Sequence, residues 1–128
     1  MTMFSKFGAF GAAHAGLAVI LGAFGAHSLK DKLPDDMLAV FETGVRYHMY
    51  HALGLILVAI IADRIGETKG IRWAGRLMHL GIFLFSGSLY ALSITELSLF
   101  GPITPLGGVS FIAAWVLVVR ALWTSRRA

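Results

Sequence analysis

Side chains that could do acid–base or nucleophilic chemistry lie inside strongly apolar stretches of this 128-residue chain. The imidazoles of His27 and His51 are candidate general bases, and the hydroxyls of Ser88 and Ser110 are candidate nucleophiles. A polar group is costly to place in hydrocarbon, so an imidazole there is by default a candidate functional group. No nucleophile elbow or similar local motif accompanies these residues. The residue types alone therefore leave the reaction open.

Metal and haem binding are the other chemistries that the histidines suggest. His48 and His51, three residues apart, could reach one ion with His27 as a third ligand. The chain has no cysteine, and no carboxylate stands beside these histidines within the span, so we predict no metal site. His14 and His79 share a depth in the opposite half of the bilayer and could face each other across a b-type haem. Closely packed, glycine-rich helices leave little room for a porphyrin, so we expect no cofactor.

The elements that must position these groups are membrane helices. The chain is 57% hydrophobic and 14% charged, whereas soluble domains carry about 25% charged residues. A bilayer core about 30 Å thick needs about 20 apolar residues per helix. We therefore predict an all-α, integral membrane, up-down-up-down four-helix bundle that forms one domain over residues 1–128. Its predicted spans are about 7–26, 47–64, 73–94 and 106–123, with an amphipathic interfacial helix at about 34–46.

The basic residues indicate the orientation. One side of the predicted spans carries most of them, and the other side carries only Lys30, Lys32 and Arg46. By the positive-inside rule, both termini are predicted to be cytoplasmic, in a multi-pass protein of the cytoplasmic (inner) membrane. The net charge of +4 is then explained by the basic residues that orient the protein in the membrane. We expect the lipid bilayer as partner and no nucleic acid, since no basic stripe is interleaved with aromatic residues.

Counting about 1.5 Å of helix rise per residue places polar side chains of four helices in one layer near the outer side. Glu42 and Arg46, four residues apart, are predicted to form an interfacial ion pair. The polar layer is either a binding cluster or a set of hydrogen bonds that only holds the bundle in register. Its predicted members are His27, Tyr47, His51, Ser86, Ser88, Tyr90, Thr104 and Ser110.

Four motifs in order carry a family resemblance: GAFGAH (22–27), ETGVRYHMYHALGL (42–55), LFSGSLY (84–90) and TPLGGVSF (104–111). They resemble the uncharacterised small four-span membrane family of YgdD- and YwdK-type bacterial proteins and human transmembrane protein 256. The resemblance implies an inner-membrane protein with four helices and no known activity. His27 and His51 fall on its motif positions, whereas His14 and His79 do not. The chain departs from the pattern at His48, where glutamine is expected.

Three functions stay open from the sequence. The favoured one is a membrane protein without enzymatic activity whose outward-facing cluster binds a lipid headgroup, a small ligand or a partner helix. Its glycine-lined helix faces would also allow a homo-oligomer. The second is an outer-leaflet enzyme that modifies lipid or lipoprotein with a histidine general base. The third is a small oligomeric transporter or channel, although no span is interrupted by proline and no inverted repeat is evident.

Overall fold

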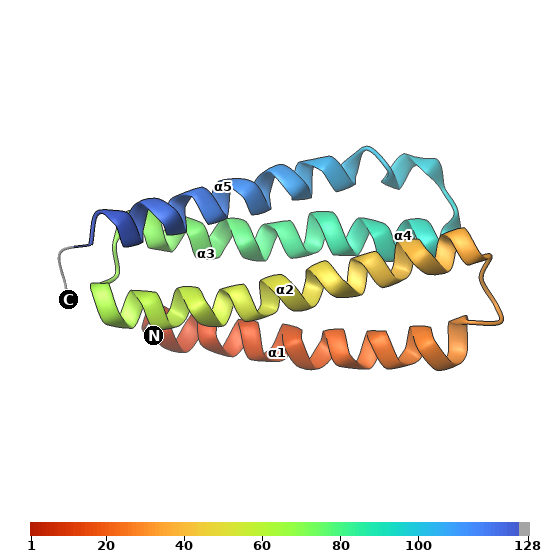
Figure 1. Cartoon of the computed structure of the whole chain (residues 1–128), viewed down its shortest axis with the longest axis horizontal. Coiled ribbons are helices and arrows are strands. Elements are labelled where there is room, and N and C mark those ends of the chain that lie inside the picture. Colours follow the sequence, from red (N-terminus) through yellow and green to blue (C-terminus); the bar gives the residue numbers. More distant parts are fainter. Residues whose placement is uncertain (126–128) are drawn as a thin grey trace.

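The computed structural model describes residues 1–125, and this part of the chain is helical throughout, with short connections and no strand. It forms four apolar rods long enough to cross a membrane: Met3–Leu29, Asp35–Ile65, Lys69–Thr95 and Ser98–Trp123. Successive rods run antiparallel, so α1 begins at the end where α5 finishes (Figure 1). The predicted all-α fold with four membrane-length helices is confirmed.

Three of the rods change helix type along their length. The first joins α1 (Met3–Phe24) to a π-helical turn, η1 (Gly25–Leu29). The third joins α3 (Lys69–Gly81) and α4 (Ser88–Thr95) through a second π-helical segment, η2 (Ile82–Gly87). The fourth joins a 3₁₀ turn, η3 (Ser98–Phe100), to α5 (Ile103–Trp123).

The second rod is a single helix, α2 (Asp35–Ile65). The separate interfacial helix expected at 34–46 and the span expected at 47–64 are therefore parts of one continuous helix. Pro34 precedes it and Asp35 and Asp36 occupy its first turn, where acidic side chains suit the positive helix end. Nothing in the residues that follow breaks the helix before Ile65.

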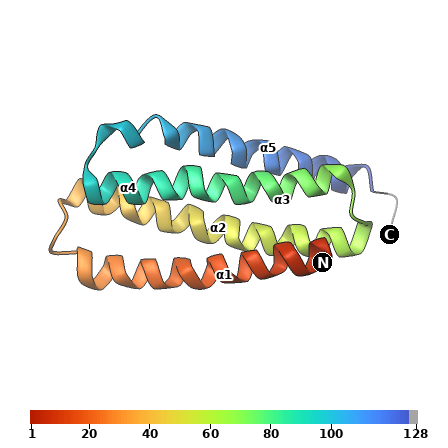
Figure 2. The same ribbon diagram turned by 180° about the vertical axis from the view of Figure 1, so that it is seen from behind.

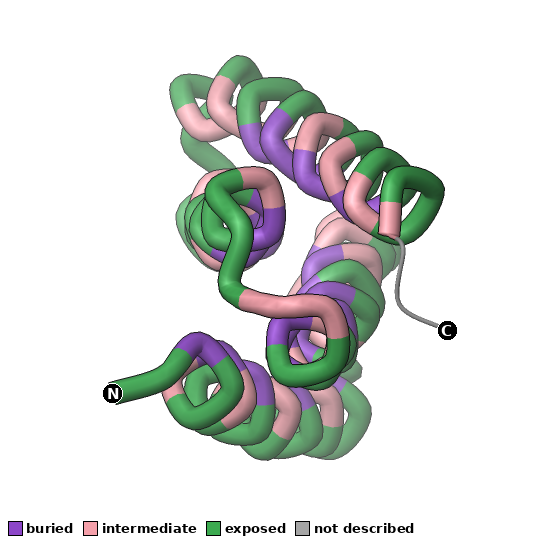
Figure 3. Tube along the Cα trace, turned by 90° about the vertical axis from the view of Figure 1, so that its left-hand side faces the viewer, coloured by how far each residue is buried: buried purple, intermediate pink, exposed green. Residues whose placement is uncertain are grey.

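Helix α2 is the central element of the bundle. It packs along α1 on one side and against α3, η2 and α4 on the other, while α3 lies along α5 (Figures 1 and 2). Buried residues face the bundle axis, and the outward faces are exposed (Figure 3). These outward faces carry large apolar side chains such as Ile20, Ile112 and Val116. A continuous apolar exterior of this kind suits lipid rather than water.

One end of the bundle is rich in cations and is called the basic end below. It holds the start of α1, the α2–α3 connection and the end of α5. Thr68 caps α3 by accepting a hydrogen bond from the Ile71 amide. The Glu67 carboxylate accepts a bond from the Met3 amide at 2.6 Å, which ties the start of α1 to the same connection. Among residues 1–125, the cations of this end are Lys6, Arg64, Lys69, Arg72, Arg76 and Arg120.

The contact between α5 and the third rod depends on the absence of a side chain at Gly107. A Cβ atom there would collide with the backbone of Phe85 in η2. At the neighbouring Gly108, a Cβ would meet the Phe85 ring at 3.9 Å, which is an ordinary contact. Close approach through small residues is how membrane helices gain packing energy without a hydrophobic driving force.

We therefore expect Gly107→Ala to lower the free energy of unfolding by about 1–3 kcal/mol, because α5 must move away from η2. Gly108→Ala is the matched control and should stay within about 0.5 kcal/mol of the wild type. Unfolding in mild detergent, followed by circular dichroism, measures both. Equal stability of the two variants would contradict the packing described.

Candidate functional site

Three histidines and one tyrosine form a continuous hydrogen-bonded chain inside the bundle, called the histidine chain below. His79 Nε2 lies 2.9 Å from His14 Nε2. His14 Nδ1 lies 2.9 Å from His48 Nε2, and His48 Nδ1 lies 2.9 Å from the Tyr90 hydroxyl. Each member comes from a different helix: α3, α1, α2 and α4 in that order. The histidine chain therefore connects the first, second and third rods.

The π-helical segment η2 explains how one rod contributes both ends. Tyr90 lies 11 residues after His79, and in a regular α-helix this separation brings two residues to within about 20° of the same face. Instead, His79 contacts His14 of α1, whereas Tyr90 contacts His48 of α2. A π turn holds an extra residue and so rotates the following helix. It thereby directs Tyr90 toward α2.

Local packing holds the Tyr90 ring in place. A Cβ atom at Gly44 of α2 would lie 2.9 Å from this ring, so only glycine permits the observed approach. The Ser86 hydroxyl, in η2, donates a 2.7 Å hydrogen bond to the Gly44 carbonyl. The Phe41 ring packs on Tyr90 with centroids 5.1 Å apart. These contacts fix the distance between α2 and the third rod at the chain's Tyr90 end.

Aromatic rings cover the other end of the chain. The Phe10 ring lies 4.7 Å from the His79 ring, and Phe83 contacts both His79 and His14. His79 also lines a cavity of about 410 Å³ together with Lys6 and Arg76 at the basic end. His48, in the middle, is only 2% exposed. The histidine chain is thus enclosed at His48, and its His79 end borders a cavity.

The arrangement can move a proton because both ring nitrogens of His14 and of His48 take part in it. A neutral imidazole donates through one nitrogen and accepts through the other. One hydrogen in each of the three links then satisfies the whole chain, in either of two directions. Such a chain can receive a proton at one end and release another at the opposite end.

The second polar group is centred on His51, which belongs to the predicted cluster. His51 donates from Nδ1 to the Tyr47 carbonyl at 2.8 Å and accepts from the Trp115 indole N–H at 3.0 Å. Its ring stacks on Phe111 with centroids 3.5 Å apart. Tyr47 itself is partly exposed, and its ring packs on Phe85. The group joins α2 to α5.

The predicted hydroxyl residues link helices in separate pairs. Ser88 and Thr104 bond to each other at 2.5 Å between α4 and α5. The Ser110 hydroxyl donates to the Leu77 carbonyl at 2.6 Å and joins α5 to α3. Ser86 bonds to Gly44, as described above. None of the three described cavities is lined by these residues, so the structure does not gather them around one pocket.

His27 stands apart from the other predicted residues. It is exposed in η1 near the end of the first rod. His51 lies 16 residues beyond Asp35, which is about 24 Å of helix axis from the same end of the bundle. The structure therefore does not bring His27 and His51 into one layer. A depth counted from a second span that starts at 47 is wrong for His51, because α2 begins at Asp35.

Glu42 and Arg46 do not form the expected ion pair. Both are exposed on α2, and within residues 1–125 no ion pair joins them. Nor does any group of three or more histidine and acidic side chains in this range have the geometry to hold a metal ion. Helix α2 does separate these charges from the imidazoles, because His48 and His51 are buried on its other face.

His14 and His79 are not members of the predicted cluster, but the structure joins them directly. The 2.9 Å between His14 Nε2 and His79 Nε2 is a hydrogen-bond distance. Their equal depth was the signal that could have revealed the contact. Equal depth alone fits a haem held between the two rings as well as it fits a hydrogen bond.

Comparison with known proteins agrees with a membrane protein. Residues 21–108 match the family model described as "Protein of unknown function (DUF423)". The UPF0382 membrane protein YwdK of Bacillus subtilis is 59% identical over 111 residues, which cover 87% of this chain and 90% of YwdK. This chain belongs to that family. A UPF0382 membrane protein of Staphylococcus epidermidis is 47% identical over 112 residues, 87% of this chain and 89% of the relative.

The family match confirms the resemblance found in the four motifs and supports a multi-pass membrane protein. The family has no characterised activity, and no solved structure matches the chain. The matched region contains His48, His79 and Tyr90, whereas His14 precedes it.

We expect His51→Ala to lower the free energy of unfolding by about 1–3 kcal/mol, since the Trp115 N–H loses its acceptor. His27→Ala is the matched control and should leave stability unchanged, because that side chain is exposed. Thermal unfolding in detergent compares the two variants. Equal losses of stability in both would show that His27 has a structural contact, contrary to this description.

Proposed function

We propose that this membrane protein transfers protons through the histidine chain. One observation carries the proposal: both ring nitrogens of His14 and of His48 are hydrogen-bonded to neighbours in the chain. A proton relay requires each group between its two ends to bond to the next group on both sides, and His14 and His48 meet this requirement. Chains of histidine within membrane helices are a recognised form of proton relay.

The transfer balances as a concerted shift. A proton arrives at the Tyr90 oxygen, and Tyr90 passes its own hydrogen to His48 Nδ1. His48 releases its Nε2 hydrogen to His14 Nδ1, and His14 releases its Nε2 hydrogen to His79 Nε2. His79 then releases its Nδ1 hydrogen into the neighbouring cavity. One proton enters and one leaves, and every broken bond to hydrogen is matched by a new one.

The histidine chain covers about half of the thickness of the bilayer core, which is about 30 Å. The 11 residues from His79 to Tyr90 correspond to about 16 Å of helix axis. Tyr90 lies five residues before Thr95, the last residue of α4, which is about 8 Å from that end of the helix. At the other end, the His79 cavity also contacts Lys6 and Arg76 of the basic end. A proton must therefore cross about 8 Å between the end of α4 and Tyr90 to enter the histidine chain.

This proposal is a specific form of the transporter alternative. A narrow bundle weighs against transport of a solvated ion, but a proton passed along hydrogen bonds needs no lumen. The geometry supports ligand binding by the predicted polar layer less well. His51 and the hydroxyl residues of that layer form separate hydrogen bonds between helices and do not meet at one place. The geometry also supports a histidine-based lipid enzyme less well, since His51 uses both ring nitrogens on protein groups.

The test is proton flux into liposomes that contain the purified protein. A potassium gradient with valinomycin sets the potential, and an enclosed pH dye reports the flux. We expect flux above that of empty vesicles, and a loss on the order of 100-fold in Tyr90→Phe, which keeps the ring and removes the relay hydroxyl. His14→Gln should lose flux as well. His27→Gln, outside the chain, is the matched control and should equal the wild type.

Two results would contradict the proposal. One is a flux in the wild type that equals that of empty vesicles. The other is an unchanged flux in Tyr90→Phe, with circular dichroism showing that the variant is folded. In either case the histidine chain would be a structural network that sets the register of the helices.

A further inference from the structure

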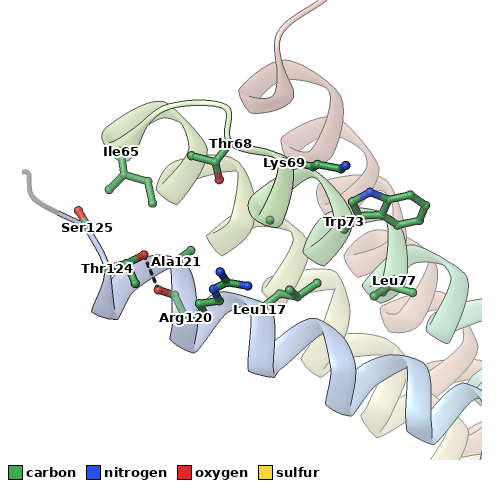
Figure 4. A pocket seen from close by; sticks show the side chains of 11 residues that line it. Ile65, Thr68, Lys69, Trp73, Leu77, Leu117, Arg120, Ala121, Thr124 and Ser125 are labelled. Atoms are coloured by element: carbon green, nitrogen blue, oxygen red, sulfur yellow. Dashed lines mark hydrogen bonds between the residues drawn. The ribbon is translucent and has the colours of Figure 1, made fainter.

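A cavity that is separate from the histidine chain lies at the basic end. The ends of α2 and α5 and the start of α3 enclose a cavity of about 860 Å³ (Figure 4). This volume lies within the range of small-molecule binding sites, about 300–1,000 Å³. No member of the histidine chain lines it. Its wall is formed by Ile65, Thr68, Lys69, Gly70, Trp73, Leu77, Leu117, Arg120, Ala121, Thr124 and Ser125.

The lining is divided into a charged part and an apolar part. Lys69 begins α3 and Arg120 lies in the last turn of α5, so two cations from different helices share the cavity. No acidic side chain is among the described residues that line it. Leu77 and Leu117 continue the wall along α3 and α5 toward the interior of the membrane-spanning region. Such a division matches a ligand with an anionic head and an apolar tail.

The backbone at the start of α3 adds to the positive character. Gly70 lines the cavity, and a Cβ atom there would meet nothing within 4 Å, so the first turn is open to this space. The N-terminal turn of a helix presents unpaired amide N–H groups and the positive end of the helix dipole. Trp73, one turn later, has the amphipathic ring that is typical of the membrane interface.

We propose that this cavity binds one anionic phospholipid of the leaflet at the basic end. The phosphate lies between Lys69 and Arg120, and one acyl chain follows Leu77 and Leu117. Basic pockets between membrane helices on the positively charged side are suited to acidic headgroups. The charge complementarity selects against zwitterionic lipids, and the apolar wall selects against a free anion. The site is independent of proton transfer, and the test below does not measure flux.

The experiment is native mass spectrometry of the delipidated full chain in detergent, titrated with dioleoyl phosphatidylglycerol. The variant is Lys69→Gln/Arg120→Gln. Lys30→Gln/Lys32→Gln is the matched control, since it removes two cations from the opposite end of the bundle. At about fivefold in affinity per cation, we expect a loss of about 25-fold in the first variant and less than twofold in the second. Lys69 and Arg120 are exposed, so thermal unfolding should confirm that both variants are folded.

Two further titrations test the occupant. Dioleoyl phosphatidylcholine should bind at least about tenfold more weakly than phosphatidylglycerol, and inorganic phosphate at the same concentration should not compete. Equal loss of affinity in both double variants would overturn the site. Equal binding of the two lipids, or displacement of phosphatidylglycerol by phosphate alone, would overturn the proposed ligand.

Discussion

The constraint on which the structure depends is that hydrocarbon offers no hydrogen-bonding partner. Every polar side chain within the bilayer must therefore be satisfied by the protein itself. In residues 1–125, every buried side-chain nitrogen and oxygen has a partner. Most of these bonds run between helices, as in the links of His48 to Tyr90 and of Ser86 to Gly44. The polar groups thus hold the helices in register, and the helices in turn hold the polar groups at hydrogen-bonding distance.

Two local features make the histidine chain geometrically possible. The π-helical segment η2 rotates the third rod, so that His79 contacts α1 while Tyr90 contacts α2. Gly44 removes the one Cβ atom that would keep the Tyr90 ring away from α2. π turns inside helices often occur at functional sites because they add a residue without ending the helix. Here the added residue changes which neighbour each side of the rod contacts, and the phenolic hydroxyl thereby becomes the terminal group of the chain.

The sequence predicts the fold better than the site, for physical reasons. Apolar runs of membrane length need no knowledge of packing, so the four helices follow from composition. The burial of His48 and His51 opposite Glu42 and Arg46 follows from helical periodicity within α2. The partners of His14 and His79 do not, because periodicity gives no helix-to-helix register and does not reveal η2. The error over His27 and His51 has a similar cause: the depth of a residue depends on where its helix begins, and α2 begins 12 residues before the predicted span.

The central claim is that His14 forms hydrogen bonds through both ring nitrogens, one to His48 and one to His79. Solid-state NMR of the protein with ¹⁵N-labelled histidine in lipid bilayers tests this directly, through nitrogen–nitrogen coupling across each hydrogen bond. We predict two couplings at His14, one to each neighbouring ring, and the loss of both in His14→Gln, while the signals of His27 stay unchanged. A His14 ring without coupling to either neighbour, in a folded wild-type protein, would contradict it.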